Sequence, residues 1–149
     1  KMEESLTCIL ESFNIALSEP TQYSPLVLAY IGDAVYEMII RTVIISRGNK
    51  PVKKLHTQAT HYVSAAGQAE ISRHIKDMLS DEEYTVFKRG RNSNSHSSAK
   101  NATVSDYRHA TGFEALIGFL YIKGKYKRAV ELVRAGCRGL EDNRLQLKL

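Results

Sequence analysis

Residues 24–46 read SPLVLAYIGDAVYEMIIRTVIIS and form the most apolar stretch of the chain. Ser24 followed by Pro25 is typical of a helix start, because serine can cap the first turn and proline suits its first position. Arg47 and Gly48 indicate where that helix ends. Its apolar residues surround the axis instead of forming one stripe, so we expect this helix to be buried on nearly all sides.

The same stretch is long enough to cross a bilayer, but it contains Asp33, Glu37 and Arg41, which would each be costly at the centre of a membrane. We therefore expect the central helix of a soluble protein with no membrane partner. The whole chain has 149 residues, of which 43% are hydrophobic and 25% charged, as in one globular domain. This composition excludes collagen, a disordered chain and a bare coiled coil.

Helical periodicity continues on both sides of the central stretch. The expected helices cover residues 3–18, 24–46, 52–79 with a bend around 64–67, 81–90, 106–122 and 125–138. Residues 139–149 are expected to be a frayed tail. Since no segment alternates like a half-buried strand, the sequence predicts an all-α fold. We expect a single domain over residues 1–149, with its core at about 24–138.

The cysteine content and the net charge indicate the cellular environment of the protein and the kind of partner it can bind. Cys8 and Cys137 are the only cysteines, which excludes a zinc module or a disulfide scaffold and indicates a reducing cytoplasm. Lysine and arginine number 21 against 16 for aspartate and glutamate, a net charge of +5. This modest basic excess permits an anionic partner without identifying it.

Two carboxylates stand in surroundings that do not suit them. Asp33 lies within LVLAYIGDAVY and Glu114 within ATGFEALIGFL. An ionised carboxylate in an apolar environment needs a cation, a metal ion or several hydrogen-bond donors. Glu37 follows Asp33 by one helical turn and can share its face. Oxygen ligands of this kind favour Mg²⁺ or Mn²⁺ over zinc, although each acid could instead pair with a buried arginine.

A second feature is a basic segment without acids, which extends from Tyr84 to Ser105. Its cationic and amide side chains are suited to contacts with the phosphates of a nucleic acid. The candidate RNA-binding residues are Lys88, Arg89, Arg91, Asn92, Asn94 and Lys100. The alternative is a solvated loop with no ligand.

These motifs together resemble a known family. IGDAV at 31–35 and FEALIG at 113–118 resemble the two catalytic signatures of ribonuclease III domains. Within that family, the chain most resembles the bacterial Mini-III ribonucleases, which lack a second, RNA-binding domain. The stretches that carry this narrower resemblance are LAYIGDAVYE at 28–37, FKRGRN at 87–92 and YRHATGFE at 107–114. The resemblance extends from about residue 24 to residue 138.

The resemblance implies a helical homodimer of ribonuclease III endonuclease-like domains. It implies Mg²⁺-dependent hydrolysis of double-stranded RNA, one strand per subunit, with Mn²⁺ as a possible substitute. It also implies a role in maturing precursor large-subunit (23S) ribosomal RNA. Asp33 matches the catalytic aspartate and Glu114 the metal-binding glutamate, so both are expected at the catalytic metal site.

The sequence departs from full-length ribonuclease III at three acidic positions, which here hold Leu26, Ala29 and Thr111. This departure keeps open a catalytically silent domain that binds ribosomal RNA. A third reading is a helical interaction protein whose two acids form ion pairs in the core. The role of Glu37 is also left open, as a partner of the site or as a surface charge.

Overall fold

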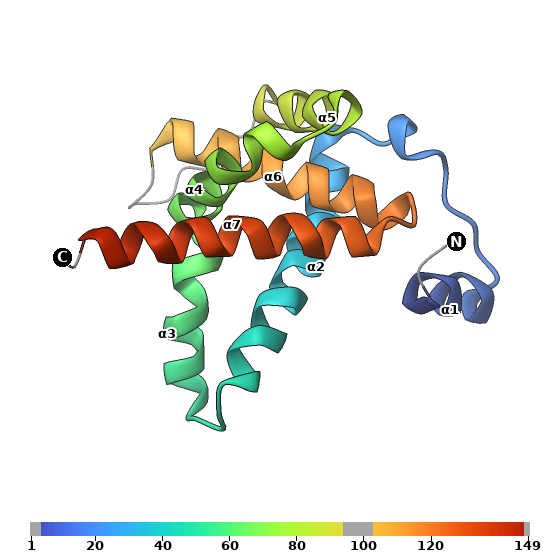
Figure 1. Cartoon of the computed structure of the whole chain (residues 1–149). Helices are drawn as coiled ribbons and strands as arrows, with labels where there is room; N and C mark the ends of the chain where they lie inside the picture. Colours follow the sequence, from blue (N-terminus) through green and yellow to red (C-terminus); the bar gives the residue numbers. More distant parts are fainter. Residues whose placement is uncertain (1–3, 94–102, 148–149) are drawn as a thin grey trace.

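The computed structural model describes residues 4–93 and 103–147, with side chains as far as residue 142. The helices are α1 (Glu4–Phe13), α2 (Pro25–Ser46), α3 (Val52–Val63), α4 (Ala65–Ile75), α5 (Asp81–Arg91), α6 (Val104–Ile122) and α7 (Tyr126–Leu147), with short 3₁₀ turns at Pro20–Gln22 and Lys76–Met78 (Figure 1). The described residues contain no strand, so the predicted all-α fold is confirmed. None of the described helices is long and apolar enough to cross a membrane.

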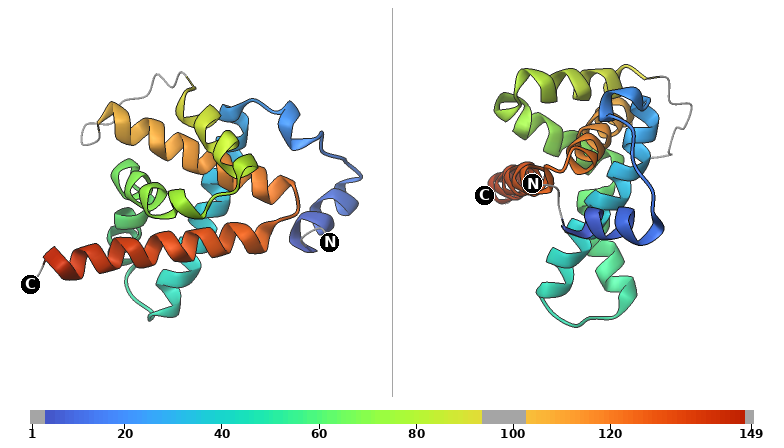
Figure 2. Two further views of the ribbon diagram at one scale, coloured as in Figure 1. Left: turned by 45° about the horizontal axis from the view of Figure 1, so that its top comes forward. Right: turned by 90° about the vertical axis from the view of Figure 1, so that its right-hand side faces the viewer.

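Helix α6 is the centre of the molecule, and α2, α4, α5 and α7 pack around it (Figures 1 and 2). Phe113, Leu116 and Ile117 are completely buried in this packing. A helix that is apolar all round needs neighbours on every side. This requirement explains why four other helices surround α6.

The backbones of α2 and α6 touch where they cross. A Cβ atom added at Gly32 would overlap the carbonyl oxygen of Glu114, and one added at Gly118 would overlap the carbonyl oxygen of Leu28. Glycine therefore allows a closer approach of the two helices than any other residue. The crossing sets Asp33, the next residue of α2, beside α6.

Two predicted helix starts are confirmed in atomic detail. The amide of Val27 donates to the Ser24 hydroxyl over 3.2 Å, which caps α2. Ser80 and Glu83 form a capping box at α5, with bonds of 2.9 and 3.2 Å. Such caps satisfy backbone amides that have no partner within the helix.

The helix predicted at residues 3–18 is shorter than expected. It ends at Phe13, because Asn14 adopts a left-handed conformation with φ of 52°. The amide of Ile15 then donates to the carbonyl of Leu10 over 3.0 Å. Asparagine tolerates this conformation better than most residues, so it can end a helix as glycine does.

The single bent helix predicted at residues 52–79 is also wrong, because Ser64 separates it into α3 and α4. The Ser64 amide donates to the carbonyl of Thr60 and ends α3, while its hydroxyl accepts from Gly67 and caps α4. The start of α6 differs less from prediction. It is capped by the nearby Thr103, whose hydroxyl accepts from the amide of Asp106.

The predicted fraying beyond residue 139 is wrong as well, since α7 continues to Leu147. Leu140 is buried in the core. The next residue, Glu141, accepts a 2.8 Å hydrogen bond from the hydroxyl of Tyr62 and pairs with Arg47 at 3.4 Å. These contacts with α3 and with the residue that follows α2 extend the helix past residue 138, its expected end.

Helix α2 is not buried on nearly all sides, as its composition suggested. One side faces the core through Tyr36, but Tyr30 is 82%, Met38 66% and Ile45 60% exposed. The lower half of α2 forms a hairpin with α3 that extends away from α6 (Figure 1). A single chain therefore leaves an apolar strip of α2 uncovered, which we call the α2 strip: Leu26, Val27, Tyr30, Met38 and Ile45.

Candidate active site

A cleft of about 820 Å³ opens between α2, α4 and α6. It is the place where the two unusual acids of the sequence meet, Asp33 from α2 and Glu114 from α6. The cleft is lined by Leu26, Ala29, Tyr30, Ile31, Asp33, Ala34, Glu37, Val63, Ala65, Gln68, Tyr107, Ala110, Thr111 and Glu114. Its lining combines apolar side chains with a few polar ones, among them the two acids, as is typical of a ligand site.

The two acids occupy different environments within hydrogen-bond reach of each other. Asp33 is exposed to solvent, whereas Glu114 is half-buried. Burial, the hydrogen bond to Asp33 and the negative charge of Asp33 raise the pKa of Glu114 to about 9. The charge of Glu37 acts in the same direction, and a hydrogen bond from Gln68 opposes it. Without a cation, this raised pKa favours the protonated form of Glu114 at neutral pH.

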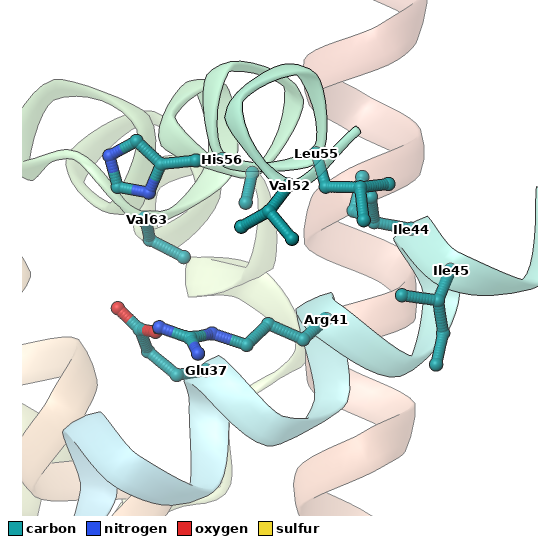
Figure 3. Close-up of a pocket in the computed structure, with 9 residues that line it drawn as sticks. Glu37, Arg41, Ile44, Ile45, Val52, Leu55, His56 and Val63 are labelled. Atoms are coloured by element: carbon teal, nitrogen blue, oxygen red, sulfur yellow. The ribbon is translucent and has the colours of Figure 1, made fainter. Parts of the chain in front are cut away.

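Glu37 also lines the cleft, but Arg41 neutralises it. The Arg41 guanidinium contacts Glu37 Oε2 at 2.7 and 2.9 Å, one helical turn away (Figure 3). Glu37 and Arg41 also line a smaller cavity of about 270 Å³ between α2 and α3, beside His56 and Val63. Glu37 thus carries a partnered charge near the site, so it is less available to a cation than Asp33 or Glu114.

Gln68 is a cleft residue that the sequence analysis missed. It lies in the first turn of α4 and is only 3% exposed. Its Nε2 donates to the carbonyl of Val63 over 3.0 Å, whereas its Oε1 has no hydrogen-bond partner. The available signal was a glutamine on the same helical face as Ile71 and Ile75, where an apolar residue is usual.

The basic end of α5 lies against the other side of α6. A Cβ atom at Gly90 would be 3.2 Å from the carbonyl oxygen of Thr111, a residue of the cleft. Lys88, Arg89 and Arg91 surround this contact point in the last turn of α5. Asn92 caps the helix end, while the predicted RNA-binding residues Asn94 and Lys100 lie outside the described residues.

Comparison with known proteins identifies the family. The family model described as Ribonuclease III domain matches residues 26–125, which contain both acids and the basic end of α5. The chain belongs to the ribonuclease III family. The family suggested by the motifs at 31–35 and 113–118 is therefore confirmed.

Individual relatives agree with the family model. A Mini-ribonuclease 3 of Thermoanaerobacter sp. (strain X514) is 43% identical over 142 residues, covering 95% of this chain and 100% of that protein. A Mini-ribonuclease 3 of Clostridium tetani is 52% identical over 114 residues, 76% of each chain. A crystal structure of a protein from Fusobacterium nucleatum superimposes with a TM-score of 0.71 at 30% identity, over 79% of this chain and 94% of that one.

The ribonuclease III family implies a divalent cation, and the chemistry of the cleft fits one. The described residues contain no cluster of three or more His, Cys, Asp or Glu side chains arranged to hold a metal ion. The cleft instead offers two adjacent carboxylates and the unpartnered Gln68 oxygen. Mg²⁺ suits this donor set, because it commonly binds one or two protein carboxylates and keeps several waters.

We expect Glu114 to make the stability of the metal-free protein depend on pH. Its folded pKa is raised to about 9, so its contribution to stability is complete below its ordinary pKa and is lost as pH rises towards 9. In EDTA, Glu114→Gln should be more stable than the parent by about 2 kcal/mol or more at pH 8.5 and close to it at pH 4.5. Urea unfolding at both pH values measures the difference.

The control is Glu131→Gln, since Glu131 is exposed on α7. Its difference from the parent should not grow between the two pH values. A constant difference for Glu114→Gln as well would show that Glu114 is ionised in the folded protein at neutral pH.

Proposed function

We propose that the protein is an endoribonuclease that hydrolyses phosphodiesters of double-stranded RNA with Mg²⁺, for which Mn²⁺ can substitute. The observation that carries this proposal is the meeting of Asp33 and Glu114 in an open cleft of a ribonuclease III domain. The relatives named Mini-ribonuclease 3 support an RNA substrate. Cleavage of a long RNA duplex with and without Mg²⁺ tests the proposal directly.

Glu114 and Asp33 have different roles in the proposed mechanism. Glu114 is held by the α2–α6 crossing, so its carboxylate provides a fixed ligand position. Asp33 is solvent-exposed and completes the position at the mouth, where a phosphodiester can arrive. A bound divalent cation would polarise the phosphoryl group and lower the pKa of an attacking water. The carboxylates of Asp33 and Glu114 would hold that cation in their ionised form.

The basic end of α5 is proposed to grip the RNA backbone. An A-form duplex hides its base edges in a deep groove, so proteins recognise it by shape, phosphates and 2′-hydroxyl groups. Lys88, Arg89 and Arg91 provide cations in the last turn of α5, which packs on α6, and Asn92 adds an amide. Asn94 and Lys100 follow in sequence and are proposed to extend the same surface.

We expect the double variant Arg89→Ala/Arg91→Ala to weaken binding to duplex RNA and to reduce its salt dependence. Each lost phosphate contact should lower the slope of log K against log salt by about 0.7–0.9. Fluorescence anisotropy in Ca²⁺ at several salt concentrations measures the slope. Lys53→Ala/Lys54→Ala is the matched control, because it removes the same charge from exposed positions on α3. Equal slopes in both double variants would show that the end of α5 does not contact the RNA.

The α2 strip supports the proposed homodimer, in which each subunit cuts one strand. An isolated chain would expose these apolar side chains, and exposed apolar side chains gathered on one helix are typical of an interface. We expect a sedimentation mass near twice 16.8 kDa at micromolar concentration. Tyr30→Asp should shift the protein to a monomer, whereas Met78→Asp, at another exposed apolar site, should not. A monomeric parent would contradict cutting by a symmetric pair.

The proposed natural substrate is precursor large-subunit (23S) ribosomal RNA in the cytoplasm. A second candidate function is a silent domain that binds ribosomal RNA without cutting it. The observation in its favour is that Leu26, Ala29 and Thr111, which replace the further acids of full-length ribonuclease III, all line the cleft. The presence of both Asp33 and Glu114 at one point favours the enzyme.

A further inference from the structure

Gln68 has an oxygen whose position in the cleft needs an explanation. Its side chain is almost completely buried, yet Oε1 has no hydrogen-bond partner. Buried polar atoms nearly always have a partner, because leaving one unpaired is costly. The unpartnered oxygen of Gln68, in the wall of the cleft, is therefore able to take a further partner.

The contacts of Gln68 within the protein involve its nitrogen only. Nε2 donates to the carbonyl of Val63 at the end of α3, which ties α4 to the preceding helix, and the amide also gives a hydrogen bond to Glu114. The bond to Val63 secures the junction at Ser64 and places the amide in the wall of the cleft. It leaves Oε1 free to accept a hydrogen bond or to bind a cation.

The surroundings of Gln68 favour a cation over another donor. Glu114 lies beside the amide, and Asp33 lies beside Glu114. Side chains from α2, α4 and α6, those of Asp33, Gln68 and Glu114, therefore line the same cleft. An amide oxygen is a good ligand for Mg²⁺ and Mn²⁺, and unlike another carboxylate it adds no charge repulsion to the acid pair.

We propose that Gln68 Oε1 is a third protein oxygen of the cation site, beside Asp33 and Glu114. This inference rests on the proposed function, since it assigns a ligand to the cation which that function requires. It also explains how the cleft can hold a cation although Leu26, Ala29 and Thr111 have no carboxylate. The neutral amide supplies an oxygen from α4.

The test is Mn²⁺ binding to the full-length protein without RNA, measured by calorimetry or by the electron paramagnetic resonance of free Mn²⁺. Gln68→Leu should bind Mn²⁺ at least about tenfold more weakly than the parent, the scale of losing one ligand contact. Gln58→Leu is the matched control. Gln58 also has a buried Oε1 without a partner, but it lies on α3 and does not line the cleft.

Thermal melting in EDTA shows whether Gln68→Leu folds. If it does not, Gln68→Glu provides a second test of the inference. A carboxylate at this position retains an oxygen, so this variant should bind Mn²⁺ at least as tightly as the parent. Folded Gln68→Leu with parent-like Mn²⁺ affinity would overturn the inference, as would weaker binding by Gln68→Glu. A parent that binds no Mn²⁺ would overturn both this inference and the metal-dependent function, whereas parent-like Gln68→Leu would overturn this inference alone.

Discussion

Asp33→Asn is expected to abolish the cleavage of double-stranded RNA, with a rate reduction on the order of 10³-fold or more. Asparagine has the same shape as aspartate, so the exposed position on α2 can accept it without a cavity. The variant lacks one of the two carboxylate charges that would hold the cation. Single-turnover cleavage of a long duplex with saturating Mg²⁺ measures the loss.

Three comparisons make this result specific to the site. Addition of EDTA to the parent should stop cleavage as completely as the substitution does. Asp77→Asn, at an exposed position in the short turn before α5, should cut at the parental rate. RNA binding by Asp33→Asn should persist, because the basic end of α5 is unchanged.

The stability of Asp33→Asn distinguishes the remaining interpretations. In the metal-free protein, Asp33 lies beside another carboxyl group, so its removal should leave stability unchanged or raise it slightly. A marked loss of stability, together with no effect of Mg²⁺ on the parent, would favour the interpretation that the two acids form ion pairs in the core. A parent that binds duplex RNA but does not cut it would favour the silent RNA-binding domain.

The parts of the fold that the sequence predicted depend on local chemistry. Ser24 with Pro25, and Ser80 with Glu83, identify helix starts because the capping groups lie within one turn. Asp33 and Glu114 were predicted as a pair because a carboxylate in an apolar run needs a partner wherever the chain folds. The RNA-binding roles of the basic segment stay predictions. Two of its residues, Asn94 and Lys100, also lie outside the described residues.

The parts that the sequence did not predict depend on distant contacts. The tail continues as helix because Glu141 meets Tyr62, 79 residues away in the chain. The unpartnered oxygen of Gln68 follows from the position of α4 relative to α6, which no local pattern encodes. Conversely, the break at Ser64 does have a local signal, because serine is a common helix cap. The small residues at 65–67 predict only a bend there.

The glycines of the α2–α6 crossing connect the fold to the site most directly. Gly32 precedes Asp33, and its Cα faces the backbone of α6 at Glu114. The atom that a larger residue would strike is a backbone carbonyl oxygen, which cannot move aside like the end of a side chain. Any separation of the helices at this point also separates the two carboxylates.

We expect Gly32→Ala to destabilise the protein by about 3 kcal/mol or more and to abolish cleavage, although alanine in a free helix would add about 1 kcal/mol of stability. Gly118→Ala should have a similar effect, because its Cβ would strike Leu28 from the other side of the crossing. Urea unfolding measures both. Ala66→Gly, at an exposed position on α4, exchanges the same two residue types and should cost only about 1 kcal/mol. If Gly32→Ala were as stable as the parent, the helices would have room to separate, and the position of Asp33 beside Glu114 would not depend on this contact.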